Sequence, residues 1–135
     1  MPRLLRIILA AGLGLLAWFV VATVGDWLIR AALPGYAAAE PGLRFTLPMM
    51  IARLILGAVS SCAAGLVCAF AARALPVAAA VLAAVLLLLF LPVHYSLWSR
   101  FPFWYHATFL VSLVLLTLVG ARAAQRFPAP RSPAT

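Results

Sequence analysis

The sequence predicts an all-α membrane protein in which four transmembrane helices form one bundle. The chain has 135 residues, of which 67% are hydrophobic and 9% are charged, whereas a soluble domain has about 45–50% apolar and about 25% charged residues. The apolar residues form long runs that arginine, proline and glycine residues separate. A run of about 20 apolar residues can cross the hydrocarbon core of a bilayer as a helix. We therefore expect one domain, residues 1–126.

The first helix is predicted over residues 4–28, because nineteen uncharged residues separate Arg6 from Asp26. At about 1.5 Å rise per residue, this run suits a hydrocarbon core about 30 Å thick. Arg3 and Arg6 resemble the start of a signal peptide, but the apolar run is longer than the about 7–15 residues of a signal sequence. The run also lacks well-placed small residues for cleavage, so we expect it to remain as a helix.

The second helix is predicted over residues 46–72, after a connection over residues 30–45 that is rich in proline and glycine. Residues 37–39 of this connection can form one short turn. Thr46 can cap the helix, and Pro48 is tolerated in its first turn. Small residues then follow at four-residue spacing, namely Gly57, Ser61, Gly65 and Ala69. Such rows let membrane helices approach closely, so we expect this helix at the centre of the bundle.

The third and fourth helices are predicted over residues 76–91 and 102–124. The link over residues 73–76 is so short that the second and third helices should form an antiparallel hairpin. Pro92 is expected to end or kink the third helix, because proline cannot donate the next helical hydrogen bond. The proline-rich residues 127–135 are predicted to be a disordered tail.

The arginines predict the orientation in the membrane. The net charge is +8, which in a soluble protein would suggest nucleic acid. Here the arginines stand at the ends of apolar runs, as topology signals do, and we expect no nucleic-acid partner. With the N-terminus inside, the inner side holds Arg3, Arg6, Arg73, Arg122, Arg126 and Arg131, and the outer side holds Arg30, Arg44, Arg53 and Arg100. Cytoplasmic loops carry the excess of positive residues, so both termini are predicted to be cytoplasmic.

Four ionisable residues are predicted at one depth, near the outer edge of the hydrocarbon. Nineteen or twenty residues separate each of them from an arginine of the inner side, and they are Asp26, Arg53, His94 and His106. At 100° per residue, Arg53 shares a helix face with Gly57, Ser60, Ala64, Cys68 and Ala71, and His106 shares one with Leu113, Thr117, Gly120 and Ala124. Small residues line helix contacts, so both side chains should point inward. We expect an ion pair between Asp26 and Arg53, with the two histidines close by.

An outer rim is predicted beside this layer, mostly from the stretch between Pro92 and His106. Its candidate residues are Glu40, Tyr95, Trp98, Arg100 and Trp104. Tyrosine and tryptophan are typical of the belt at the membrane–water interface. The same residues could form a cradle for a lipid or quinone head group together with Arg100, and the two interpretations are compatible.

Catalytic and metal-binding interpretations of these residues have less support. Two histidines on separate helices can ligate haem, but both lie at helix ends. A zinc site needs three or four ligands, and the sequence offers His94, His106, Asp26 and Glu40. A Ser–His–Asp triad would use Ser96 or Ser99, which rests on a very common pairing of residues. Proton-coupled transporters normally hold a charge near the bilayer centre, and no predicted helix has one there.

The two cysteines, Cys62 and Cys68, lie six residues apart on different faces of one helix and are interpreted as small buried hydrophobic residues. We therefore expect no metal, no cofactor and no enzymatic activity. The polar layer is either structural or part of a ligand site.

Several segments together resemble a known pattern: Tyr36-Ala-Ala-Ala-Glu-Pro41, Met50-Ile-Ala-Arg53-Leu, Pro92-Val-His94-Tyr, Trp98, and Phe101-Pro-Phe-Trp-Tyr-His106. This pattern is similar to that of a family of uncharacterised small four-helix inner-membrane proteins of Gram-negative bacteria. The resemblance covers most of the chain and implies a location and an architecture, without an activity.

From the sequence, the expected role is that of a non-enzymatic inner-membrane component that packs with itself as a homo-oligomer, or with a membrane protein partner, among membrane lipids. The alternative is a binder or carrier of a small amphipathic ligand, of lipid or quinone type, at the periplasmic face. The small-residue row favours the first role, and the polar layer favours the second.

Overall fold

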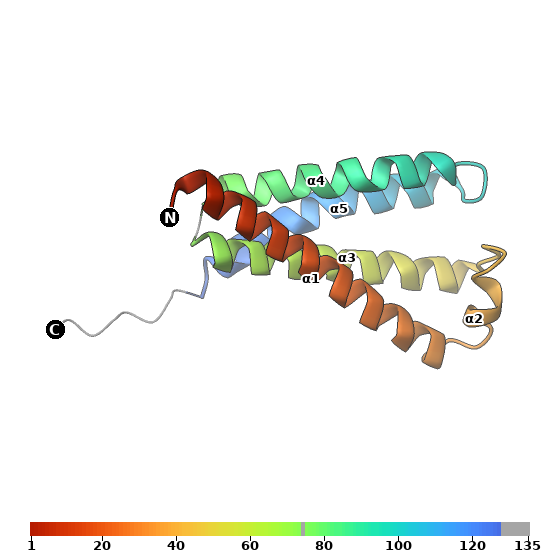
Figure 1. The fold of residues 1–135 in the computed structure, drawn as a ribbon. Helices are drawn as coiled ribbons and strands as arrows, with labels where there is room; N and C mark the ends of the chain where they lie inside the picture. The colour runs from red at the N-terminus through yellow and green to blue at the C-terminus, as the bar shows by residue number, and fades with distance from the viewer. Residues whose placement is uncertain (74, 128–135) are drawn as a thin grey trace.

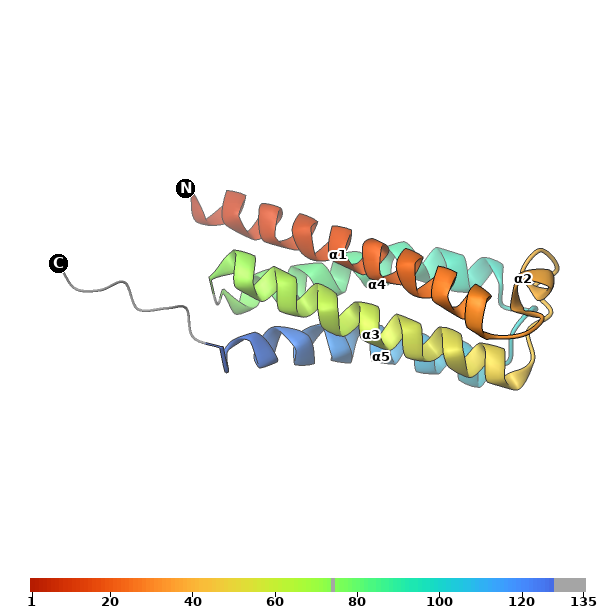
Figure 2. The same cartoon turned by 90° about the horizontal axis from the view of Figure 1, so that it is seen from below.

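A computed structural model describes residues 1–73 and 75–127 of the chain. Within them lie four long helices and one short one: α1 (Arg3–Ala32), α2 (Tyr36–Ala39), α3 (Leu47–Ala72), α4 (Pro76–Ser96) and α5 (Phe103–Ala124). Each of the four long helices is long and apolar enough to cross a membrane. They run side by side in one bundle (Figures 1 and 2), which confirms the predicted all-α four-helix fold.

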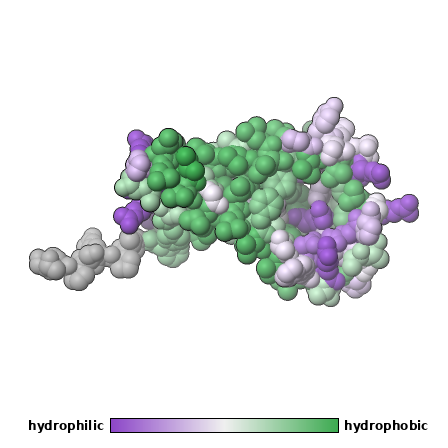
Figure 3. Space-filling model, in the orientation of Figure 1, coloured by the Kyte–Doolittle hydropathy of each residue, from purple (hydrophilic) through white to green (hydrophobic). Residues whose placement is uncertain are grey.

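The bundle has two different ends. The N-terminus and the end of α5 lie at one end, called here the terminal end, and α2 lies at the other, called here the α2 end (Figure 1). Hydrophobic residues cover the middle of the molecule, and hydrophilic residues gather at both ends (Figure 3). This distribution is that of a multi-pass membrane protein, because side chains between the ends face lipid rather than water.

Helix α3 lies at the centre, with its most extensive contacts to α1 and α5. A Cβ atom on Gly65 would overlap the carbonyl oxygen of Thr117, so the backbones of α3 and α5 touch at this point. Ser61 accepts a hydrogen bond from Trp18 Nε1 of α1 at 3.1 Å. Gly57 packs against Phe109 of α5. Gly57, Ser61 and Gly65 of the predicted small-residue row therefore pack within the chain, while Ala69 is half-buried.

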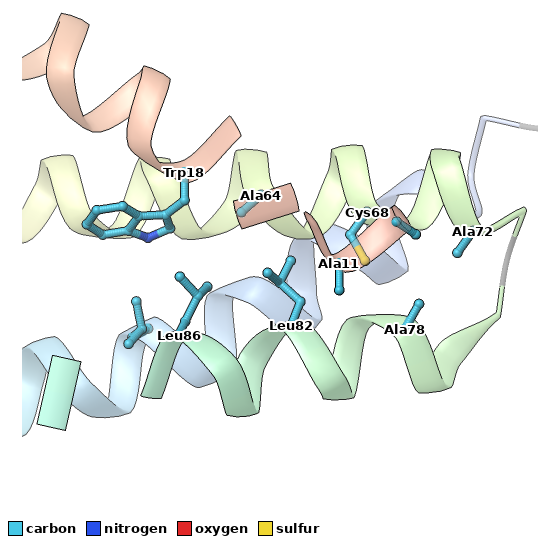
Figure 4. Close-up of a cluster of buried hydrophobic side chains, with 10 residues drawn as sticks. Ala11, Trp18, Ala64, Cys68, Ala72, Ala78, Leu82 and Leu86 are labelled. Carbon is cyan, nitrogen blue, oxygen red and sulfur yellow. The ribbon is translucent and has the colours of Figure 1, made fainter. Parts of the chain in front are cut away.

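The core lies between α1, α3 and α4. Ala64, Cys68 and Ala72 of α3 face Leu82 and Leu86 of α4 across this core (Figure 4). Small side chains on one helix against leucines on another fill the space without voids. The faces predicted from helical phase are confirmed: of the residues expected beside Arg53 and His106, all are buried except the half-buried Ala71.

Two helices are longer than predicted. Helix α1 continues four residues past residue 28 to Ala32, because a charged residue marks the edge of the hydrocarbon and need not end the helix. Helix α4 continues through Pro92 to Ser96, so of the two outcomes expected at this proline, an end or a kink, the end is excluded. The last turn of α4 is held against α5 by a contact between His94 and His106. The tail predicted over 127–135 falls, from residue 128 on, outside the described residues.

Candidate functional site

The α2 end contains a cavity of about 460 Å³. Its lining comes from all four long helices, from Glu40 next to α2, and from Leu97 and Phe101 between α4 and α5. Helices α1 and α4 diverge toward this end (Figure 1), and hydrophilic residues are visible in the space between them (Figure 3). The cavity therefore lies at the depth where the sequence predicts the polar layer.

The divergence of α1 follows from where it packs tightly. A Cβ atom on Gly14 would lie 2.9 Å from the carbonyl oxygen of Ala64, so α1 is pressed against α3 near this glycine. Beyond it, the large Trp18 side chain is buried and lies 4.6 Å from Phe90 of α4, measured between ring centroids. Nearer the α2 end, a Cβ atom on Gly25 would overlap Leu56, so α1 stays against α3 while it opens away from α4. Trp18 thus forms the inner wall of the cavity.

The apolar wall continues as a row of aromatic rings. Phe90 lies 5.2 Å from Phe109, and Phe109 lies 4.6 Å from His94, between ring centroids. These tilted arrangements are the ones that aromatic rings prefer. The row leads from the apolar depth of the cavity to its polar end.

The polar end is an unbroken chain of hydrogen bonds and ion pairs. Arg30 Nη2 pairs with Glu40 Oε2 at 2.7 Å, and Arg30 Nε pairs with Asp26 Oδ2 at 2.9 Å. The Tyr36 hydroxyl donates to Asp26 Oδ1 at 3.1 Å and accepts from Arg53 Nη1 at 2.7 Å. Arg53 Nε then donates to the Tyr105 hydroxyl, at 3.3 Å. The chain joins α1, α2, α3 and α5.

The predicted ion pair between Asp26 and Arg53 is corrected by this geometry. Asp26 pairs with Arg30, one turn further along α1, and the Tyr36 hydroxyl stands between Asp26 and Arg53. Two facts explain the difference. Helix α1 extends far enough to carry Arg30, and α2 folds back so that the fully buried Tyr36 fills the gap.

Aromatic side chains surround the guanidinium group of Arg53. Its Cζ atom is 4.7 Å from the ring centroid of Phe45, a cation–π distance. Phe45 in turn stacks on Tyr36 and on Phe101. Both hydrogen-bond partners of the guanidinium are tyrosine hydroxyls. Arginine has five N–H donors, and within the described residues two of them have partners, so the rest are free to bind an acceptor.

The charges at the polar end balance. Two carboxylates, Asp26 and Glu40, and two guanidinium groups, Arg30 and Arg53, line the cavity. Burial raises the pKa of the Tyr36 hydroxyl above its ordinary value, although the Arg53 guanidinium acts in the opposite direction. Tyr36 is therefore neutral at pH 7, which allows it to donate and accept at once. A ligand head group meets a wall with no net charge.

The two histidines form a pair beside this wall. His94 Nδ1 and His106 Nδ1 are 2.7 Å apart, with the rings nearly perpendicular at 85°. Both side chains are buried, and Trp98 stacks on His106. At this distance one nitrogen must carry the shared proton and the other must accept it. The two rings therefore hold opposite tautomers.

The surroundings of His106 assign the tautomers. His106 Nε2 is buried without a hydrogen-bond partner among the described residues. A buried N–H without an acceptor is rarer in proteins than a buried acceptor without a donor, which favours a bare Nε2 and a protonated Nδ1 on His106. His106 then donates to His94, and His94 carries its proton on Nε2. Because His94 lines the cavity and His106 does not, the pair supplies one N–H donor to that wall.

The structure divides the predicted rim. Glu40 lines the cavity, and Trp98 stacks on His106 of the histidine pair. Tyr95 is 84% exposed and Trp104 is 41% exposed, and Arg100 is exposed as well. Tyr95, Arg100 and Trp104 are not among the residues that line the cavity. They occupy the positions expected of an interfacial belt.

Three polar residues of the site escaped the sequence reasoning: Arg30, Tyr36 and Tyr105. Arg30 carried a usable signal, since it follows Asp26 by four residues, the spacing of neighbours on one helix face. Tyr105 adjoins His106 in the same helix, and neighbouring residues do not share a face. Tyr36 lies in a connection whose path the sequence does not specify.

No family model, curated protein or solved structure matches this chain. Within the described residues, no three histidine, cysteine, aspartate or glutamate side chains come together as a metal site would require. The function must therefore be argued from the cavity itself.

Proposed function

We propose that the protein binds an amphipathic molecule in the cavity at the α2 end, with an uncharged, oxygen-bearing head group against the polar chain. The proposal rests on one observation. The same cavity has a row of aromatic rings on one side and free N–H donors of Arg53 and His94 on the other. Ligand sites in proteins are typically apolar cavities with a few convergent polar groups. This cavity has that composition.

The charge balance selects the head group. A charged head group would leave a net charge in a partly buried wall, which is costly in a low-dielectric environment. A neutral group that accepts hydrogen bonds, such as the carbonyl of a quinone, matches the donors of Arg53 and His94. The polar groups can then all be paired.

The apolar part of the ligand has a direct route from the membrane. The cavity lies between the diverging parts of α1 and α4, and the apolar residues Leu56, Phe90 and Val93 line it. Outside the cavity, the same part of α1 exposes Val20, Val24 and Leu28. A hydrocarbon tail could therefore pass from the cavity to lipid without crossing a polar surface.

For the location, we propose the bacterial inner membrane with the α2 end on the periplasmic side. At the terminal end, Arg3, Arg6, Arg73, Arg122 and Arg126 stand without an acidic residue. At the α2 end, Arg30 is paired with carboxylates and Arg53 is held by tyrosines. With Arg44 and Arg100, the α2 end has four arginines against five described ones at the terminal end, and this excess supports cytoplasmic termini.

The packing role favoured by the sequence has less support than ligand binding. Its main signal was the small-residue row, and most of that row contacts helices of the same chain. A self-associating or partner-binding role would need a separate surface. We therefore place ligand binding first.

Thermal unfolding of the detergent-solubilised protein with added probes tests the proposal. The probes share a ten-carbon tail and differ in the head: decyl-1,4-benzoquinone carries neutral acceptors, decanoate carries a charge and decylbenzene carries no polar group. A ligand at a hundred times its Kd stabilises the folded state by about 2.7 kcal/mol. We expect the benzoquinone to raise the unfolding temperature more than either of the other probes.

Matched variants locate the effect. Arg53→Gln should remove most of the stabilisation by the benzoquinone, whereas Arg44→Gln, which changes an exposed loop charge of the same end, should leave it intact. Ala22→Phe adds a ring to a residue that lines the cavity, and Val24→Phe adds the same ring to an exposed position of α1. Equal responses of the members of either pair would contradict binding in this cavity.

A further inference from the structure

A second cavity, also of about 460 Å³, lies at the terminal end, the opposite end of the bundle from the first cavity. It opens between the C-terminal part of α5 and the start of α4. Its polar lining comes from α5 and the two residues after it, namely Arg122, Gln125 and Arg126. Its apolar lining includes Leu75, Ala79 and Leu118. We propose that this crevice binds the phosphodiester head of an anionic phospholipid, with the first part of an acyl chain on the apolar wall.

The charge of this end favours an anionic partner. Both acidic residues of the chain, Asp26 and Glu40, lie at the α2 end, where they pair with Arg30. The arginines of the terminal end have no ion pair among the described residues. Arg122 and Arg126 are one helical turn apart and share the crevice. Arginine matches the geometry of phosphate oxygens, which it can bind through two N–H groups at once.

The arginines are available for this contact. The carbonyl groups of the last turn of α5 already accept backbone hydrogen bonds: Gln125 N–H donates to Arg122, and Arg126 N–H donates to Ala123, both at 3.1 Å. The guanidinium groups are thus not needed to cap the helix. In addition, α4 begins at the crevice with Leu75 and Pro76, and the positive end of the helix dipole favours an anion there.

The apolar wall distinguishes a lipid from a free phosphate ion. A phosphate ion needs donors alone, whereas this crevice continues from the arginines onto Ala69, Ala79 and Leu118. Basic crevices between membrane helices are a known binding mode for anionic head groups. The crevice can therefore hold the phosphate and glycerol of a lipid at the arginines, and part of one acyl chain on the apolar wall. This inference is independent of the function proposed for the α2 end.

Native mass spectrometry of the detergent-solubilised protein tests the inference. Phosphatidylglycerol and phosphatidylcholine with identical acyl chains are added in equal amounts, and the ratio of the two bound forms is measured. Each arginine near an anionic lipid strengthens binding about fivefold. We expect a clear preference for phosphatidylglycerol that falls about 25-fold in the double variant Arg122→Gln/Arg126→Gln, if the two effects multiply.

The matched control is Arg3→Gln/Arg6→Gln, which removes the same charge from the same end but not from the crevice. The control should keep the preference, and an equal loss in both double variants would show a diffuse field and overturn the site. Ala69→Leu, which narrows the apolar wall and keeps every charge, should also weaken phosphatidylglycerol binding. If the Ala69→Leu variant kept full binding, or if millimolar inorganic phosphate displaced the lipid, the proposal that a lipid occupies the crevice would be refuted. Circular dichroism verifies that each variant is folded.

Discussion

The role of Tyr36 gives the sharpest prediction, because one hydroxyl group joins Asp26 to Arg53. The change Tyr36→Phe removes a hydrogen bond of 3.1 Å to a carboxylate and one of 2.7 Å from a guanidinium. Hydrogen bonds to charged groups contribute about 1.5–3 kcal/mol each. The Asp26 side chain is 24% exposed, so water can replace part of its loss, and Arg53 keeps its bond to Tyr105. We expect Tyr36→Phe to lower the free energy of unfolding by about 2 kcal/mol.

A double-mutant cycle of Asp26→Asn and Arg53→Gln tests how the two charges communicate. Residues of one hydrogen-bond network show coupling energies of about 0.5–3 kcal/mol. Because the coupling passes through the Tyr36 hydroxyl, it should fall close to zero when the cycle is repeated in the Tyr36→Phe background. The assay is reversible unfolding in mixed micelles, followed by circular dichroism.

The control is Tyr95→Phe, since Tyr95 is 84% exposed. Surface substitutions of this kind change stability by about 0.5 kcal/mol or less. If the coupling between Asp26 and Arg53 keeps its full value in the Tyr36→Phe background, the two charges interact directly and the bridging role of the hydroxyl is refuted.

Three further outcomes are expected. Gly65→Ala should lower the free energy of unfolding by about 1–3 kcal/mol, because the new methyl group overlaps the backbone of α5. Gly12→Ala should raise it by up to about 1 kcal/mol, because an added Cβ atom has nothing within 4 Å. Chemical unfolding compares the two variants, and equal effects would contradict the close contact between α3 and α5. Burial raises the pKa of the Tyr36 hydroxyl, so as pH rises the unfolded chain loses this proton at a lower pH than the folded chain does. Stability should therefore hold below about pH 10 and fall above it. The fall should be smaller in Tyr36→Phe, and an unchanged fall would argue against the raised pKa. Nitrogen-15 NMR should find the proton of His106 on Nδ1 and that of His94 on Nε2, and the reverse assignment would refute the tautomers given above.

Counting residues along each helix predicted the depth of much of the candidate site. Counting residues from the inner arginines placed Asp26, Arg53, His94 and His106 at one depth, and the structure brings three of these four to one cavity and pairs His106 with His94. This success has a physical reason. A regular helix rises by about 1.5 Å per residue, so sequence separation converts directly into depth along a membrane-spanning segment.

The partner of Asp26 could not be predicted in the same way. Depth and phase say which residues share a level, but they do not say which of several neighbours at that level is in contact. The choice depends on how far α1 leans away from α4, and on where the connection places Tyr36. A difference of one side-chain diameter decides between a direct ion pair and a bridged one.

By itself, the sequence determined that this protein is a four-helix membrane protein, and it determined which faces of α3 and α5 point inward. These properties are local, because a bilayer requires each spanning segment to be apolar and to satisfy its own backbone hydrogen bonds. Only the tertiary structure decided that the polar layer borders a cavity instead of closing on itself. The physical reason is the tight contact of α1 at Gly14 followed by the bulk of Trp18, which separates α1 from α4 and leaves Arg53 and His94 with donors to offer.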